Sequence, residues 1–217
     1  MVCAVSHPVF ARTFPAMSRA MEAGGIAEHR KELLADLAGE VIDVGAGTGA
    51  SFGHYPAPVT RVLAVEPEPR LRAVAEAAAQ AVAVRIEVVG GTAGELPAGD
   101  ASYDAGMVSF VLCTVPDQDA ALAEIRRVLR PGGSLYFLEH VRADSARLVR
   151  MQRALDTTVW PHLFGGCHLS RDTTAAIERA GFTIDRLEKF MFPTARTPVS
   201  FHIAGHASKT GQVLRQY

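Results

Sequence analysis

The chain has 217 residues, of which 48% are hydrophobic and 21% charged, a composition that excludes a disordered or fibrous protein. Its formal net charge of −1, from 22 basic and 23 acidic residues, provides no overall positive field and disfavours a nucleic-acid partner. Cys3, Cys113 and Cys167 match no zinc-ligand spacing, so we expect no metal site and a reduced, cytoplasmic setting.

The first segment of the chain predicts a pair of helices, at residues 9–22 and 26–38. Leu33, Leu34 and Leu37 form an apolar stripe on the second helix, and the glycine that follows should end it. The first 20 residues contain two arginines and two prolines and have no apolar run like that of a signal peptide. Because no stretch of about 18 uncharged apolar residues occurs, we expect no membrane span.

The next part of the chain alternates between strand and helix patterns. Short β-branched runs separated by helical segments predict five buried parallel strands, at residues 40–45, 60–66, 84–90, 103–109 and 134–140. A helix over 117–130 should end at the Pro-Gly-Gly turn before the fifth strand. This order predicts an α/β fold with a doubly wound sheet.

The final part of the chain predicts a helical insertion after the fifth strand, with helices at about 144–160 and 171–180. Two strands, 182–190 and 200–208, should then close the fold as an antiparallel hairpin. Four arginines gather at the start of the insertion: Arg142, Arg147, Arg150 and Arg153. We interpret them as a solvated helix face in preference to a contact for an anionic substrate or a membrane surface.

The segment VIDVGAGTGA places Asp43 near a strand end, followed by Gly45, Gly47 and Gly49 at alternate positions. Glycines allow a backbone to approach a ligand closely, and a helix N-terminus after the turn would offer N–H groups. Glu66, at the end of the second strand, lies where a carboxylate can accept both hydroxyls of a ribose. The segment also fits the dinucleotide pattern GxGxxA or a ligand-free turn, but a carboxylate before the turn favours a cationic ammonium over a pyrophosphate.

These motifs resemble those of the class I, Rossmann-like S-adenosylmethionine-dependent methyltransferases, over about residues 26–208. The resemblance implies a mostly parallel seven-stranded sheet with an antiparallel final strand, and S-adenosylmethionine as the cofactor. It also implies that the strand acid and the glycines hold the methionyl part, and that Glu66 holds the ribose. The positions carried over to this part of the cofactor site are Asp43, Gly45, Ala46, Gly47, Gly49, Glu66 and Pro67.

Two further segments resemble the cofactor loops of that family. In GGTAGELPAGDASYD (90–104), a threonine stands where the family commonly has an aspartate, so the candidates for the adenine contact are Thr92, Ala93, Gly94 and Glu95. The stretch SFVLCTVPD (109–117) implies that Ser109, Phe110 and Cys113 line the cofactor near its sulfonium.

The acceptor should bind beyond the fifth strand, because ligands of open α/β sheets bind outside the carboxyl ends of the strands. We name His140 and Asp156 as candidate catalytic residues, with Glu139 as a further candidate at the same strand end. His140 fits either a general base or a polar cap on the next helix. Trp160 fits core or pocket wall better than a cation platform, and Cys167 fits a packing residue better than a nucleophile.

The sequence therefore predicts a single domain over residues 1–217. It would consist of N-terminal helices (1–38), a cofactor-binding core (39–140), an acceptor-side insertion (141–181) and a C-terminal hairpin (182–208).

The string LEHV, with Gln152, Asp156 and Trp160 after it, further resembles the thiol methyltransferases of animal microsomes, and more loosely the quinone and phospholipid methyltransferase branch. We expect no membrane-anchoring helix like that of the microsomal enzymes. The expected reaction is methyl transfer to a small molecule, either a thiol or a hydroxyl compound. An NAD(P)-dependent oxidoreductase, a noncatalytic S-adenosylmethionine-binding protein and a homodimeric assembly stay open.

Overall fold

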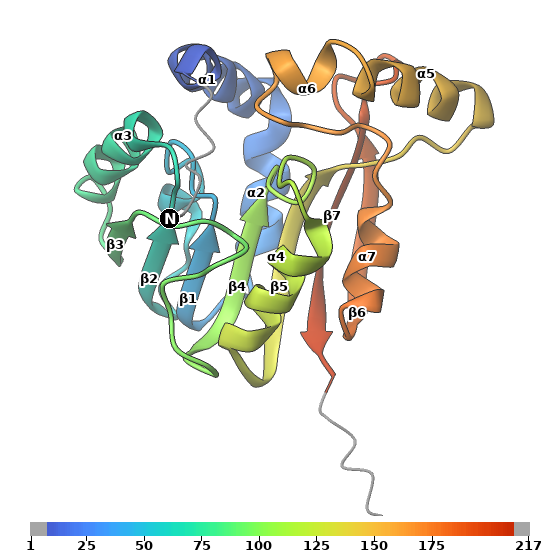
Figure 1. Cartoon of the computed structure of the whole chain (residues 1–217). Coiled ribbons are helices and arrows are strands. Elements are labelled where there is room, and N and C mark those ends of the chain that lie inside the picture. Colours follow the sequence, from blue (N-terminus) through green and yellow to red (C-terminus); the bar gives the residue numbers. More distant parts are fainter. Residues whose placement is uncertain (1–7, 211–217) are drawn as a thin grey trace, which may run out of the picture.

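Figure 1 shows the computed structural model, which describes residues 8–210; residues 1–7, with Cys3, and 211–217 lie outside the described part. The strands are β1 (Gly39–Val44), β2 (Val59–Val65), β3 (Arg85–Val89), β4 (Tyr103–Ser109), β5 (Leu129–His140), β6 (Phe182–Met191) and β7 (Phe201–Lys209). The helices are α1 (Pro8–Met21), a π-turn (Glu22–Ile26), α2 (Ala27–Leu34), a 3₁₀ turn (Phe52–His54), α3 (Pro69–Ala79), α4 (Gln118–Val128), α5 (Ala146–Asp156), α6 (Trp160–Leu163) and α7 (Thr173–Arg179).

The strands form one seven-stranded sheet in the order β3-β2-β1-β4-β5-β7-β6. Neighbouring strands from β3 to β5 run parallel. The final strand, β7, inserts between β5 and β6 and is antiparallel to both. These observations confirm the predicted doubly wound, mostly parallel sheet with an antiparallel final strand.

Helices pack against both faces of the sheet, since its strands carry apolar side chains on both sides. On one face α4 and α7 bury Leu122, Ile125 and Ile177 completely. On the other face α2 and the π-turn before it bury Leu34 and Ile26. Figure 1 shows α1, α5 and α6 above the carboxyl ends of the parallel strands. The upper edge of the sheet is therefore bordered by the first helix of the described chain and by two helices that follow β5.

The connection between β1 and β2 differs from the expectation that an α-helix follows the glycine turn. In the described chain, residues 45–58 form tight turns with a single 3₁₀ turn among them. Gly45, Gly47 and Gly49 have φ angles of +71°, +58° and +77°, which a right-handed helix does not accommodate. The N–H groups of a helix N-terminus, which the sequence predicts after this turn, are therefore missing here.

Several predicted boundaries also shift. The insertion helix predicted over 144–160 is two helices, α5 and α6, because the chain leaves the helical ladder in a turn at residues 157–159. The fifth strand begins at Leu129 instead of residue 134, since Leu129 already pairs with Tyr103 of β4. The predicted helices at 9–22 and 26–38 are joined by the π-turn, in which Gly25 has a φ of +125°.

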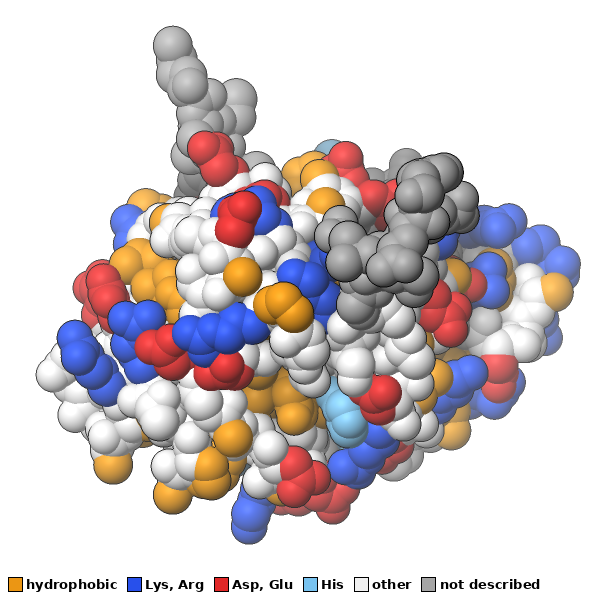
Figure 2. Space-filling model, turned by 90° about the horizontal axis from the view of Figure 1, so that it is seen from below, with side chains coloured by type: hydrophobic (Ala, Val, Ile, Leu, Met, Phe, Trp, Pro, Cys, Tyr) orange, Lys and Arg blue, Asp and Glu red, His pale blue; other side chains and the backbone are white. Residues whose placement is uncertain are grey.

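The lower edge of the sheet carries charges of both signs, which are interspersed in the view from below (Figure 2). Here Glu40 binds Arg130 at 2.7 Å and Arg61 at 3.3 Å. Arg130 also pairs with Asp104. Acids and bases thus compensate one another at this end of the molecule. Within residues 8–210, no helix has both the length and the apolar character needed to cross a bilayer.

Candidate functional site

The glycine turn after β1 is tightly packed against its neighbours. A Cβ atom on Gly45 would lie 2.5 Å from Cγ2 of Val111, so a side chain at this position would displace the loop after β4. The N–H groups of Gly45 and Ala46 both donate to the carbonyl of Val65, at 2.8 and 3.1 Å. Because these donors are already used within the protein, the turn is poorly suited to hold a pyrophosphate.

Glu66 links the glycine turn to the end of β2. Its carboxylate accepts hydrogen bonds from the N–H groups of Gly47 at 2.8 Å and Glu68 at 2.9 Å. Burial raises the pKa of Glu66, and these two hydrogen bonds oppose that change. Close by, Oε2 of Glu68 is buried and has no hydrogen-bond partner within residues 8–210. Two acidic side chains therefore lie at one strand end, and one has an acceptor oxygen free for a ligand hydroxyl.

Asp43 lies in β1 just before the turn and is almost completely buried, with 2% of its surface exposed. Its Oδ2 accepts a hydrogen bond of 2.7 Å from the hydroxyl of Tyr55. Burial raises the pKa of Asp43 to about 6, although this hydrogen bond and the positive charge of Arg30 lower it. A cationic group bound beside Asp43 would favour the charged carboxylate.

Arg30 of α2 is a buried residue of the site that our sequence reasoning missed. Its guanidinium binds the carboxylate of Glu22 at 2.8 Å and donates to the hydroxyls of Ser51 at 3.1 Å and Ser109 at 2.8 Å. The available signal was its position on the apolar stripe of its helix, four residues before Leu34. An arginine at such a position is buried only when partners satisfy its charge.

A first cavity, of about 470 Å³, lies beside the ends of β1 to β4. It brings together the predicted residues Gly45, Gly47, Glu66, Pro67, Ser109 and Phe110. The predicted adenine-contact residues Thr92, Ala93 and Gly94 line the same cavity after β3. Glu68 also borders it, so the free carboxylate oxygen of that residue belongs to this site.

A second cavity, of about 290 Å³, adjoins the first and extends towards α1, α6 and the end of β5. Its wall is largely aromatic and aliphatic, with Met17, Met21, Trp160, Phe164, Phe192 and Val199. Four residues predicted for the site line this cavity and not the first: Asp43, Ala46, Cys113 and His140. The two cavities share Phe10, Phe14, Gly45, Gly47, Ser109, Phe110 and Thr114.

Glu139 of β5 is fully buried beneath the loop that separates the two cavities. Its carboxylate accepts three backbone hydrogen bonds, from Val111 at 2.9 Å, Leu112 at 3.0 Å and Cys113 at 3.1 Å. Burial raises the pKa of Glu139 to about 7, while the three hydrogen bonds lower it. The side chain therefore holds the shared loop in place and is occupied by backbone contacts.

His140 lines the second cavity, and both of its ring nitrogens contact other residues. Its Nε2 lies 2.6 Å from the carbonyl oxygen of Val199, and its Nδ1 lies 3.7 Å from Sγ of Cys167. Because a carbonyl only accepts, Nε2 carries the proton in this bond and Nδ1 is the acceptor of the neutral ring. The ring stacks on His202, at 4.6 Å between centroids. His202 is a second buried residue that the sequence reasoning missed, and burial lowers its pKa to about 3, so it stays neutral.

Two buried thiols, Cys113 and Cys167, lie beside His140. The hydrogen bond between them raises the pKa of Cys113 and lowers that of Cys167. The loops that carry them are joined by a 2.7 Å hydrogen bond from the N–H of His168 to the carbonyl of Cys113. The indole N–H of Trp160, in the same cluster, is buried without a hydrogen-bond partner among the described residues.

Three predicted residues lie away from both cavities. Gly49 packs against Phe52, and the exposed Glu95 forms a turn with Thr92. Asp156 accepts hydrogen bonds from the N–H groups of Leu169 at 2.6 Å and Ser170 at 2.9 Å. Its carboxylate thus fixes the loop after α6, and Asp156 itself is not part of either cavity wall.

Comparisons with known proteins find methyltransferases among the similar chains. A family model described as a methyltransferase domain matches residues 42–137. Human thiol S-methyltransferase TMT1A is 36% identical over 172 residues, which cover 78% of this chain and 70% of the relative. The ubiquinone/menaquinone biosynthesis C-methyltransferase UbiE of Methylobacterium nodulans is 33% identical over 178 residues, covering 80% and 68%. A Thermotoga maritima structure described as a SAM-dependent methyltransferase, possible histamine N-methyltransferase, has a TM-score of 0.68 at 20% identity and covers 93% and 98% of the two chains.

Proposed function

The chain belongs to the class I S-adenosylmethionine-dependent methyltransferases, and from this premise we propose that its methyl acceptor is a small, largely apolar thiol. S-adenosylmethionine is the methyl donor, and the acceptor is a small molecule. The oxidoreductase and noncatalytic alternatives are not favoured, since the matched relatives are methyltransferases. The expectations of a cytoplasmic setting and of a homodimer stay predictions.

The observation that carries this proposal is the apolar second cavity that opens onto the first at Ser109 and Phe110. Aromatic and aliphatic side chains at its wall favour an apolar acceptor body, because burying that body removes apolar surface from water. A thiol suits this cavity as the reacting group, since a sulfur nucleophile can react in apolar surroundings. The thiol methyltransferases among the relatives support the same choice.

The first cavity suits the donor, together with the adjoining part of the second cavity that Asp43 lines. In this proposal Asp43 faces the methionyl ammonium, Glu66 and Glu68 accept hydrogen bonds from the ribose hydroxyls, and Thr92 to Gly94 contact the adenine. The buried carboxylate of Asp43 and the unpaired Oε2 of Glu68 are the two features that a cationic, hydroxyl-bearing nucleoside would satisfy. When bound, S-adenosylmethionine supplies a methyl group on a good sulfonium leaving group.

His140 provides the acceptor chemistry in this proposal. Its Nδ1, held in the acceptor form by the Val199 carbonyl, takes the proton as the acceptor S–H bond breaks. The lone pair of the acceptor sulfur would then be free to form the new S–CH₃ bond, while the sulfur of the bound donor would keep the electron pair of the bond that breaks. The aromatic wall excludes water from this step.

Asp156 acts indirectly in this proposal. Its two hydrogen bonds to the loop at Leu169 and Ser170 position the segment that carries Cys167, which contacts His140. We therefore assign Asp156 a positioning role within the acceptor-side insertion at residues 141–181.

A methyl-transfer assay with a radiolabelled methyl donor tests the acceptor class. The panel pairs an apolar aromatic thiol with the matching phenol and aniline, and includes a hydroquinone because of the quinone-pathway relative. We expect kcat/KM for the thiol to exceed that for the phenol by at least about tenfold. Mass spectrometry should locate the new methyl group on sulfur. Preferential methylation of the phenol, the amine or a ring carbon would contradict the proposal.

A further inference from the structure

The outer side of α5 and α6 exposes large apolar side chains. Met151, Val159 and Leu163 are 44%, 54% and 64% exposed, and they are three of the five large hydrophobic residues exposed in the described part of the chain. Single exposed apolar residues are ordinary, but a group confined to residues 151–163 is typical of an interaction surface.

Basic side chains surround these apolar residues. Arg147, Arg150 and Met151 follow the spacing of one helix face, and Arg153 is exposed beside them. None of the three arginines forms an ion pair within residues 8–210. The sole acid of residues 145–163 is Asp156, and its carboxylate faces the loop at Leu169 instead of the arginines. The positive charge of this face is therefore uncompensated.

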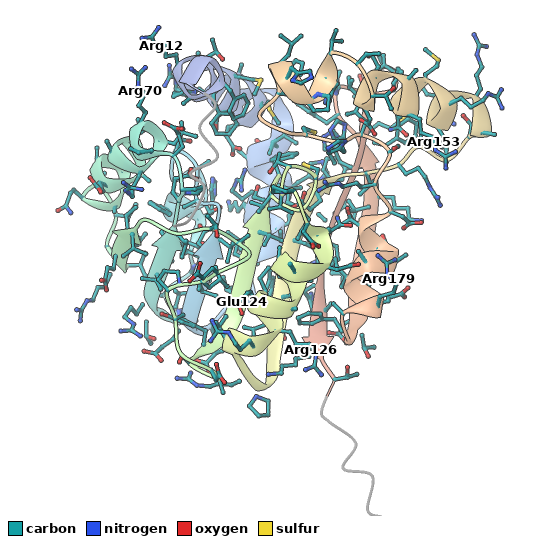
Figure 3. All side chains as sticks on the ribbon, viewed as in Figure 1. Arg12, Arg70, Glu124, Arg126, Arg153 and Arg179 are labelled. Atoms are coloured by element: carbon teal, nitrogen blue, oxygen red, sulfur yellow. The ribbon has the colours of Figure 1, made fainter. Side chains whose placement is uncertain are left out.

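This distribution differs from the lower edge of the sheet, where acids and bases are interspersed (Figure 2). Figure 3 shows Arg153 and Arg12 at the upper end of the molecule and Glu124 and Arg126 at the lower end. At the lower end Arg127 pairs with both Glu124 and Asp100. Ion pairs thus neutralise these arginines at the lower end, whereas the three exposed arginines of α5 have no ionic partner within residues 8–210.

The α5–α6 face lies directly behind the wall of the second cavity. Trp160 and Phe164 point into that cavity, whereas Val159 and Leu163 of the same short helix are exposed. Next to α6, the loop at Gly165 packs against Phe10 of α1, so these two elements close the cavity together. A compound held at the outer face would be separated from the second cavity by one turn of helix.

From these observations we propose that Arg147, Arg150, Met151, Arg153, Val159 and Leu163 form a face that docks on an anionic lipid bilayer. The guanidinium groups attract the lipid phosphates, and the three apolar side chains enter the headgroup region. Docking would place the second cavity beside a reservoir of apolar acceptors. This surface does not depend on the acceptor being a thiol, since lipid binding is measured without turnover.

Vesicle flotation with the whole chain tests the docking directly. The probes are vesicles of phosphatidylcholine alone and of phosphatidylcholine mixed with phosphatidylserine. We expect at least about tenfold stronger binding to the anionic vesicles, with a steep loss as salt increases. The double variant Arg147→Glu/Arg150→Glu should lose at least about tenfold in that binding. Its control, Arg85→Glu/Arg186→Glu, changes the charge equally at exposed sites of β3 and β6 and should bind like the parent.

A second pair of variants tests the apolar part of the face. Met151→Ser/Val159→Ser/Leu163→Ser should weaken binding to anionic vesicles, whereas Val74→Ser, at an exposed site of α3, should not. Unchanged melting temperatures will show that all the variants fold, and unchanged S-adenosylhomocysteine affinity will show that the donor site is intact. Equal binding to neutral and anionic vesicles, or no loss in the charge-reversed variant, would overturn the proposal. Self-association that requires the three apolar residues, without vesicle binding, would do the same.

Discussion

The first cavity is formed mostly by residues that directly follow consecutive strands, with Phe10, Phe14 and Gly165 beside them. The second takes most of its wall from segments far apart in the chain, from α1 to His202 of β7. A strand end fixes the position of the next residues in any parallel sheet, so the first cavity can be predicted from local patterns. The second depends on how α1, α6 and the loop before β7 pack over that edge. The comparison shows that donor recognition is encoded locally and acceptor recognition is encoded by tertiary packing.

The loop that Glu139 holds lines both cavities, and the largest effect that we predict concerns the ionisation of this carboxyl group. Burial raises the pKa of Glu139 from 4.5 to about 7. Between these values the folded protein keeps a proton that the unfolded chain loses, so the free energy of unfolding should fall as the pH rises from about 4.5 to about 7. At about 1.4 kcal/mol for each pH unit of the difference, the loss is on the order of 3 kcal/mol.

Denaturant unfolding of Glu139→Gln at several pH values measures this contribution. The variant should show a much smaller fall in stability across that pH range, because its amide does not ionise and only the raised pKa values of Asp43 and Glu66 remain to contribute. The exposed Glu95→Gln is the matched control and should retain the parent profile. A parent protein whose stability rises across this range would contradict the assignment.

His140→Gln should affect the acceptor region alone. Removing the Nδ1 acceptor, which contacts Sγ of Cys167 beside the second cavity, should lower kcat with a thiol by about a hundredfold, as expected for a general base. S-adenosylhomocysteine affinity, measured by calorimetry, should stay within about twofold because the first cavity does not include this residue. As a control, His206→Gln, which stacks on Tyr136 away from both cavities, should leave both quantities unchanged. Normal turnover by the His140 variant would remove the histidine from the mechanism.

The variants Asp43→Ala and Glu66→Ala test the donor region, as His140→Gln tests the acceptor region. Each should weaken S-adenosylhomocysteine binding by more than about tenfold, because each removes a buried carboxylate proposed to contact the ligand. Isothermal titration calorimetry provides the measurement, and Asp43→Asn separates loss of charge from loss of shape. Unchanged affinity in either alanine variant would place the donor elsewhere.

Phe164→Ala should produce the smallest effect, confined to the second cavity. Losing part of an apolar wall should raise the KM of an apolar thiol by about fivefold, since only part of the ring contacts the acceptor. Steady-state kinetics at saturating donor gives this value. If donor affinity fell as much as acceptor affinity, the two regions would not be separable at this wall.

The difference between the two regions also explains which residues the sequence predicted. Asp43, Glu66 and Thr92 lie where the glycine turn and the strand ends indicated, because the parallel sheet fixes those positions. The predicted helix after the turn is absent, since successive positive φ angles exclude it. Asp156 was assigned from its place in the chain, and the structure turns its carboxylate towards Ser170 instead.

Spacing places Arg30 on an apolar helix stripe, but it reveals neither the partners of Arg30 nor the position of His202 in the site. The burial of Arg30 depends on Glu22, Ser51 and Ser109, which come from three separate segments. No local sequence pattern predicts that these residues come together. Likewise, the stack of His202 on His140 follows from the antiparallel pairing of β5 with β7. Long-range pairing of this kind is fixed by the completed fold.

The shared wall at Ser109 and Phe110 has a thermodynamic consequence. Because the same side chains border both ligands, occupancy of one cavity changes the surroundings met by the other, and any gain in affinity must be reciprocal. The binding free energies of donor and acceptor should therefore be coupled, and methyl transfer should proceed within a ternary complex.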